Sequence, residues 1–348
     1  MGSLALYSRY VINGVQQELT PAGILDAVCD ARRDYIETAG VVVDELVDPA
    51  IGLHTFDAGR IREYLEKVEG VENPCVPPAF SEAYSRLRVA TALVDTLWKA
   101  GHFTLEDLRP EAVWSWDFSP VGAAASFYQS VRSVAEYVDS LDLRLSSYSL
   151  YDGDDCRFSV ELQQLPEGRI CPAKADPDPQ SWLVYVPFDP CDFRLGGSAL
   201  ARELGIGGGV APQIGDADYF IDCFEVLREL VEDGVVIAGA TVGDGGLLCA
   251  LKKMCADTGI SVDVSDIMKS YDEDNVVRVL FSEVPGALIQ IKDLDFDYLD
   301  AQLLLQDVAF FPLGHPDSSV HDVLVRAGEK SGIQKILESL MQNAEGED

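Results

Sequence analysis

The chain has 348 residues, and 47% of them are hydrophobic, which is enough for two domains and a substantial buried core. Its 59 acidic and 26 basic residues give a net charge of −33, which repels the phosphates of nucleic acids and of anionic lipids. We therefore expect neither a nucleic-acid-binding nor a membrane-binding protein. The scattered acids favour a well-solvated surface, with a basic partner as the alternative.

The first 74 residues predict a mixed segment of strand and helix. The expected elements are a strand at 10–14, a helix that begins after Thr20 with Pro21 in its first turn, and a helix at 57–70 that Asp57 caps and Gly70 ends. A proline-rich stretch at 72–80 then breaks both helix and strand. We place a boundary there and treat 1–74 as an N-terminal extension of unknown role.

The rest of the chain mixes helices with strands. Up to residue 188 the pattern predicts helices at 80–100 and 127–142 and strands at 143–151 and 182–188. Beyond it we expect helix 198–204, helix 219–233, strand 235–238, helix 246–257, strands 261–264, 277–281 and 287–292, helix 296–305, strand 308–312 and helix 333–343. This order predicts an α/β (α+β) fold.

Cysteine and histidine usage argues against disulfides and zinc. The eight cysteines are scattered without a C-x-x-C pair, and no N-terminal apolar segment resembles a signal peptide. Reduced thiols in the cytosol or nucleus are therefore expected. The four histidines form no ligand-like pair, and no apolar run is long enough to cross a bilayer.

One stretch, 237–254 (IAGATVGDGGLLCALKKM), places an aspartate beside two glycines where a strand hands over to a helix. Such a turn can hold phosphate or metal. Glycines there also serve the backbone, because a tight turn often needs positive φ or close approach, and Asp244 can cap the helix instead. The four tryptophans are expected to be core or interface aromatics.

Several segments together resemble formylglycinamidine ribonucleotide (FGAM) synthetase, also called PurL, of the PurM or AIR-synthase superfamily. The match is to the second PurM-like repeat of the single-chain form and covers about 75–325. The segments are WLVYVPFDPCDFRLGGSALARELG (182–205), ELVEDGVVIAGATVGDGGLLCALKKM (229–254), GISVDVSDI (259–267), VRVLFSEVPGALIQI (277–291) and FPLGH (311–315).

The resemblance implies a PurM-like module of two domains, with an N-terminal sheet-pairing domain at 75–188 and a C-terminal α/β sandwich at 189–348. It also implies ATP-dependent amidation of formylglycinamide ribonucleotide, with Mg²⁺ on the nucleotide phosphates. That chemistry needs carboxylates for the metal and amides and a lysine for phosphate.

Most of the family's ligand-binding side chains are replaced. Its histidine-aspartate pair and Ser-Asp-Gly-Gly correspond to Ala240, Thr241, Gly243, Asp244, Gly245 and Gly246, so only the second aspartate and both glycines remain. Its Glu-Ala-Leu-Thr-Asn corresponds to 91–95, where Asp95 is the one carboxylate, and Glu283 keeps the family's residue.

The other motifs show the same loss. The family's Asn-Trp-Met-Trp corresponds to Val113, Trp114, Ser115 and Trp116, and the acid that follows it is Ala123. Its Gly-Lys-Asp-Ser, which meets nucleotide in active relatives, corresponds to Tyr148, Ser149, Leu150 and Tyr151, which removes the lysine charge and adds two bulky rings.

The pattern favours a catalytically degenerate module with a structural or protein-binding function and no catalytic residue. Asp244, Gly245 and Gly246 would be a remnant nucleotide turn, and Asp95 and Glu283 remnant metal ligands. No cofactor is expected, or Mg-ATP or Mg-ADP if the remnant site still works. The partner would be a second copy or another PurM-like chain, because an unpaired sheet is a liability.

Three alternatives stay open. The chain could be a repeat or subunit of FGAM synthetase that a partner chain completes. The tegument proteins of gammaherpesviruses also resemble FGAM synthetase and act on host proteins, and this chain could act in the same way. It could bind a less charged ligand in a pocket lined by Tyr148, Tyr151 and Trp116.

Overall fold

The structure is a computed structural model, and it describes residues 2–31, 39–49, 58–72, 75–162, 165–320 and 322–327. The chain forms two compact units. The first comprises Met1–Ala50, Asn73–Ala92 and Phe103–Leu165, and the second Ile51–Glu72, Leu93–His102 and Pro166–Asp348. Within the described ranges, none of the helices combines the length and apolar character that a membrane-spanning helix needs.

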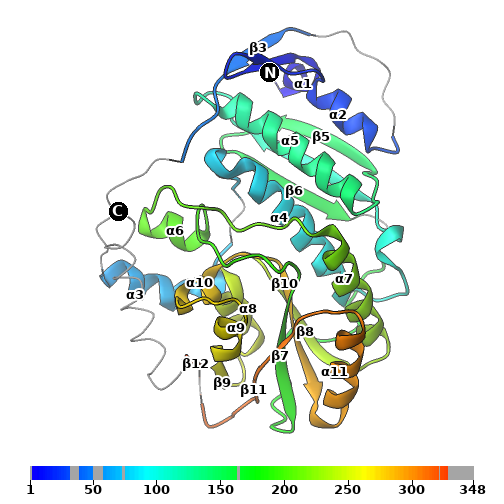
Figure 1. The fold of residues 1–348 in the computed structure, drawn as a ribbon, viewed down its shortest axis with the longest axis vertical. Coiled ribbons are helices and arrows are strands. Elements are labelled where there is room, and N and C mark those ends of the chain that lie inside the picture. The colour runs from blue at the N-terminus through cyan, green and yellow to red at the C-terminus, as the bar shows by residue number, and fades with distance from the viewer. Residues whose placement is uncertain are drawn as a thin grey trace. The chain divides into compact units, whose positions relative to one another are not determined.

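The first unit contains two three-stranded sheets (Figure 1). In one, β1 (Arg9–Ile12) pairs antiparallel with β2 (Val15–Gln16) and parallel with β3 (Val41–Asp44). Asn13 and Gly14 join β1 to β2 with positive φ at both residues, which suits a two-residue hairpin. In the other, β4 (Pro110–Trp116) lies between β5 (Ser147–Asp152), which is parallel to it, and β6 (Arg157–Leu162), which is antiparallel.

Within the described residues, four helices accompany these sheets, and the last of them packs an aromatic side chain against β4. The helices are α1 (Gly2–Tyr7), α2 (Pro21–Ala27), α4 (Ser81–Val94), whose first twelve residues belong to this unit, and α5 (Ala123–Ser140). Thr20 caps α2 by accepting from the Gly23 N–H, as expected. Trp114 of β4 contacts Phe127 of α5 and Phe158 of β6, with ring centroids 6.2 and 4.7 Å away.

The second unit is built on a four-stranded antiparallel sheet in the order β11-β7-β10-β8. The strands are β7 (Ser181–Pro187), β8 (Val236–Val242), β10 (Gly286–Lys292) and β11 (Phe311–Gly314). A parallel pair, β9 (Ile260–Asp263) with β12 (Val323–Arg326), forms a separate two-stranded sheet. The helices are α3 (Ala58–Lys67), α6 (Ala199–Leu204), α7 (Ala217–Glu232), α8 (Gly246–Met254), α9 (Ser265–Ser270), α10 (Val276–Phe281) and α11 (Phe296–Leu305).

Both faces of this sheet are covered. Leu183 and Tyr185 of β7 enter a core cluster with residues of α3, α8 and α10. Successive strand residues alternate, so Val184 and Val186, also fully buried, point to the other face. On that face Phe188 contacts Phe220 of α7, which lies with α11 on one side of the sheet (Figure 1). The near-continuous apolar run of β7 follows from this double burial.

The predicted mixed α/β class is confirmed, and one element was wrong. Residues 276–281 form helix α10 rather than a strand, because Asn275 caps it by accepting from the Val277 N–H and its apolar side chains pack in the core cluster. The elements that were not predicted are helices α1 and α9 and strands β2, β3, β4, β6 and β12. Asp57 and the helix predicted at 333–343 lie outside the described residues.

The grouping of the segments differs from the three expected ranges. Residues at 2–31 and 39–49 belong to one unit with 75–92, whereas the expected extension ended at 74. Strand β7 belongs to the second unit, because it pairs with β10 and β11. All eight cysteines lie within the described residues, and none of them forms a disulfide.

Candidate functional site

The turn at 243–246 joins β8 to α8, and both of its last glycines have positive φ. Gly245 has φ +77° and Gly246 has φ +74°. A Cβ atom on Gly246 would lie 2.6 Å from the carbonyl oxygen of Leu280 in α10. The backbone therefore requires glycine at both positions. Gly245 occupies the N-cap position of α8, one residue after Asp244.

Glu283 braces this turn from a buried position. Its side chain is 3% exposed, and Oε1 accepts hydrogen bonds from the Gly245 N–H at 2.9 Å and the Ala199 N–H at 3.1 Å. Ala199 begins α6, so the carboxylate satisfies one of the unpaired amides at that helix end. Bonds of this kind are what a buried carboxylate needs to offset its desolvation. The arrangement gives Glu283 a structural reason to be retained.

Asp95 lies in the 3-10 turn Asp95–Trp98 and bonds to β8. The Thr241 hydroxyl donates to Asp95 Oδ1, and Trp98 Nε1 donates in turn to the Thr241 oxygen at 2.9 Å. The three side chains form one directed chain from indole to hydroxyl to carboxylate. By the resemblance described above, Thr241 corresponds to an aspartate of the family and Asp95 to an asparagine. At these two positions the chain therefore has a hydroxyl that donates and a carboxylate that accepts.

The carboxyl of Asp95 keeps an exposed surface although many protein atoms surround it. This desolvation raises the pKa of Asp95 above its ordinary value, against the opposing effects of the Thr241 hydrogen bond and the Arg169 charge. The negative charge of Asp244 also raises the pKa of Asp95, as a smaller effect than desolvation.

Trp98 is held in place by close packing on β8. A Cβ atom on Gly239 would lie 2.1 Å from the Trp98 ring, so the indole rests directly on the strand backbone. The Arg169 guanidinium lies 5.9 Å from the ring centroid and donates to the Gly239 carbonyl at 2.6 Å. The donor end of the hydrogen-bond chain is thus rigidly positioned.

These residues do not fit a nucleotide phosphate with its magnesium ion. Two amides of the turn are already used, since the Gly245 N–H donates to Glu283 and the Gly246 N–H donates to the Gly243 carbonyl at 2.9 Å. In the described part of the chain, no three histidine, cysteine or acidic side chains are grouped so that they could hold a metal ion. Of the two residues expected as metal ligands, Asp95 accepts from the Thr241 hydroxyl and Glu283 accepts from two backbone amides.

The pocket expected in the first unit does not form from its three aromatic residues. Tyr148 and Trp116 are 1% exposed, and each is bonded within the core: Tyr148 donates to Asp26 Oδ1 at 2.7 Å and Trp116 Nε1 to the Ala123 carbonyl at 2.8 Å. Tyr151, an odd number of residues from Tyr148 along β5, is 59% exposed. Trp98 and Trp114 are also buried, so the core role expected of the tryptophans is confirmed for three of the four.

Comparisons with known proteins agree with the resemblance seen in the sequence. Residues 187–292 match the family model of the AIR synthase related protein, C-terminal domain. The chain is 23% identical over 265 residues to phosphoribosylformylglycinamidine synthase of Homo sapiens, covering 72% of this chain and 19% of the relative. It is 24% identical over 315 residues to the probable chloroplastic/mitochondrial enzyme of Arabidopsis thaliana, covering 83% and 21%.

Solved structures show the same fold. PurLQS from Thermotoga maritima superposes with a TM-score of 0.50 at 15% identity, covering 71% of this chain and 40% of that one. T. maritima PurL complexed with FGAR gives a TM-score of 0.50 at 14% identity, covering 71% and 41%. The chain spans about a fifth of the length of the curated relatives it matches. The expected resemblance to a PurM-like repeat of FGAM synthetase is confirmed.

Proposed function

We propose that this chain is a catalytically inactive FGAM-synthetase-like module that acts by binding another protein, either a second copy of itself or another PurM-like chain. The observation that carries the proposal is that the residues of the remnant site form hydrogen bonds with other groups of the same chain. The Thr241 hydroxyl donates to Asp95, and the Gly245 N–H donates to Glu283, so these groups, which would meet Mg-ATP, already have partners within the fold.

The outward face of the β5-β4-β6 sheet is the surface we assign to the partner. Tyr151 is exposed there and lies in register with the small Ser115 of β4, which pairs on its other side with Arg157 of β6. Exposed aromatic and arginine side chains are enriched at protein interfaces. We assign the face rather than the β6 edge, because Cys75 forms a β-bridge with Arg157 there and the Val76 N–H donates to the Cys156 carbonyl at 2.8 Å.

Calorimetric titration with Mg·ATP and Mg·ADP tests the loss of nucleotide binding, with Mg²⁺ alone as the control. We expect no binding heat at millimolar nucleotide. Micromolar binding that is lost in Asp95→Asn and Asp244→Asn would contradict the proposal. It would favour the alternative of an FGAM synthetase subunit completed by a partner chain.

Light scattering of the same sample tests the pairing. We expect the mass of a dimer, and we expect Tyr151→Glu to shift it toward the monomer because a charge is placed in the interface. Tyr298→Glu on α11 is the matched control, since Tyr298 is also exposed but lies in the second unit. A monomer at all concentrations would contradict self-pairing and leave a different PurM-like chain as the partner to test.

A further inference from the structure

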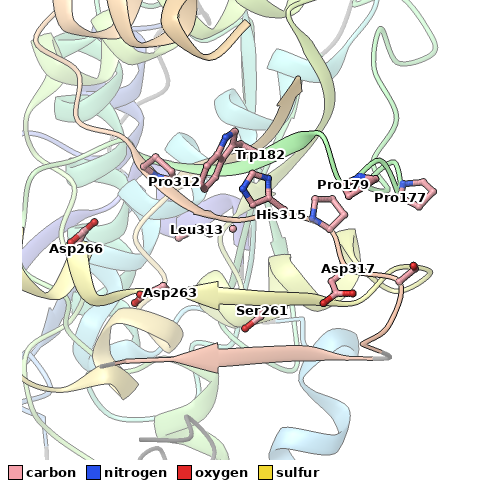
Figure 2. Close-up of a pocket in the computed structure, with 13 residues that line it drawn as sticks. Pro177, Pro179, Trp182, Ser261, Asp263, Asp266, Pro312, Leu313, His315 and Asp317 are labelled. Carbon is pink, nitrogen blue, oxygen red and sulfur yellow. The ribbon is translucent and has the colours of Figure 1, made fainter. Parts of the chain in front are cut away.

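An open groove of about 660 Å³ lies in the second unit, at the beginning of β7 (Figure 2). We call it the Trp182 groove, after the aromatic residue at its centre. It is far along the sheet from the 243–246 turn, because β10 pairs with Val242 at Gly286 and with Ser181 at Lys292, its opposite end. The groove is therefore separate from the remnant site.

An aromatic platform forms the centre of the groove. The rings of Trp182 and His315 lie 3.8 Å apart, and Phe296 supports Trp182 with its ring centroid at 5.7 Å. His315 Nδ1 donates to the Ser181 carbonyl at 2.9 Å, because a carbonyl can only accept. Trp182 is the one tryptophan of the four that keeps an accessible surface.

The walls of the groove supply acceptors and few donors. Pro177, Pro179, Pro312 and Pro316 line it, and proline has no backbone N–H. The remaining polar wall holds three carboxylates, which accept and cannot donate when ionised, and the hydroxyls of Ser261 and Ser318, which can do either. A ligand that offers several donors together with apolar surface therefore suits the groove.

Three aspartates give the groove a negative rim, shown below the platform in Figure 2. Asp263 and Asp266 are exposed, and hydrogen bonds from the Ser319 hydroxyl and N–H lower the pKa of Asp317, so it is ionised at neutral pH. Lys269 pairs with Asp266 at 2.8 Å, but both side chains are at least 75% exposed, and such a pair is readily exchanged. The rim stays negative in a chain of net charge −33.

We propose that the Trp182 groove binds an arginine side chain within an extended, basic peptide segment of a partner protein. A guanidinium carries five donors and no acceptor, and its plane stacks on an aromatic face. Over Trp182 it would meet the ring with its flat side and the rim aspartates with its edges. The inference rests on the proposed function only because it takes the partner to be a protein. It concerns the Trp182 groove, which is a different surface from the face of the β5-β4-β6 sheet.

Fluorescence anisotropy of a labelled, arginine-rich peptide, titrated with the full chain, tests the proposal. The matched probe is a peptide of the same length in which citrulline, neutral and isosteric, replaces arginine. We expect the arginine peptide to bind about tenfold more tightly, and its affinity to fall as salt is added. The same titrations with the nucleotide-site variant Asp95→Asn should give unchanged affinity, which separates this groove from the remnant site.

Two groove variants and one control locate the binding. Trp182→Leu removes the ring. Asp263→Asn with Asp266→Asn removes two charges at exposed positions, and an asparagine oxygen can still accept the bond that the Ser265 N–H donates to Asp263. We expect each to weaken the arginine peptide about tenfold. The control, Asp222→Asn with Glu229→Gln on the exposed side of α7, makes the same charge change and should bind as the wild type does.

Three results would each overturn the proposal. One is the absence of saturable binding to the arginine peptide at low salt. Another is equal affinity for the arginine and citrulline peptides. The third is equal affinity of the Asp263→Asn, Asp266→Asn variant and the α7 control, which would indicate attraction to the overall negative charge rather than to this groove.

Discussion

Arg228 of α7 fixes the segment that carries Asp95 and Trp98, and its replacement should release that segment. The side chain is 2% exposed. Its Nη1 donates to the carbonyls of Leu97 and Lys99, each at 2.8 Å, its Nη2 donates to the carbonyl of Gly101, and its Nε bonds to Glu232 at 2.7 Å. One guanidinium thus ties three backbone carbonyls of 97–101 to a helix.

The cost of Arg228→Met follows from these contacts. The ion pair itself adds little to the loss, because Glu232 is 21% exposed and keeps His102 as a partner. Each carbonyl left bare in the interior costs about 1–3 kcal/mol unless water reaches it, and Lys99 is exposed, so its carbonyl can turn toward water. With the carbonyls of Leu97 and Gly101 left without their donor, we expect a loss of about 4 kcal/mol in the free energy of unfolding of this unit. Arg228→Lys should still lose about 2 kcal/mol, because an ammonium cannot reproduce the planar fork.

Urea unfolding followed by circular dichroism measures the free energy, and amide hydrogen exchange of 93–102 reports on the segment itself. The second readout is needed because two compact units need not unfold in one transition. Arg202→Met, at an exposed position of α6, is the control and should stay within about 0.5 kcal/mol of the wild type. The reasoning is refuted if Arg228→Met falls within about 1 kcal/mol of the wild type and the exchange of 93–102 is unchanged.

Three further substitutions probe the remnant site and the first unit. Asp95→Asn should stabilise the protein at neutral pH. The raised pKa of Asp95 means that the folded wild type binds the proton more tightly than the unfolded chain, so the wild type loses stability as the pH rises from 3.8 through the folded-state pKa, and asparagine avoids this loss. Urea unfolding should show that the gain disappears below pH 3.8, the ordinary pKa of the group. Gly246→Ala should cost about 3 kcal/mol, from its positive φ and the nearby carbonyl of α10, and a loss below about 1 kcal/mol in the same assay would contradict this. Tyr148→Phe should cost about 1 kcal/mol by removing the bond to Asp26, and an unchanged melting temperature would show that bond to contribute nothing.

The local sequence pattern was sufficient to predict an element where the periodicity of its apolar residues matched their burial in the fold. The limits predicted for helix 296–305 are those of α11, and the apolar run at 182–188 is β7. It was insufficient at 276–281, where the run VVRVLF has the β-branched composition of a strand. Packing against the core cluster decides for a helix there, and packing across the chain is not visible in a local window.

The candidate site shows the same limit for side-chain partners. The sequence predicted the special backbone of Gly245 and Gly246, because glycine has a local signature at a strand-to-helix turn. It could not show that Asp95 meets Thr241, since the two residues are 146 positions apart. Their closeness depends on the register of β8 and on the position of the 93–102 segment, and both are set by the whole fold.

The identities at 95 and 241 have a physical logic once that contact is known. An aspartate at 241 would place a second carboxylate against that of Asp95, which Thr241 contacts, and like charges held together are stable only when a cation or a proton lies between them. Threonine donates its hydroxyl to Asp95 and accepts from Trp98, so it satisfies both neighbours without a metal ion. The Asp95 carboxylate therefore has a protein donor in place of a metal ion, and the contact between the 3-10 turn and β8 depends on side chains of the chain alone.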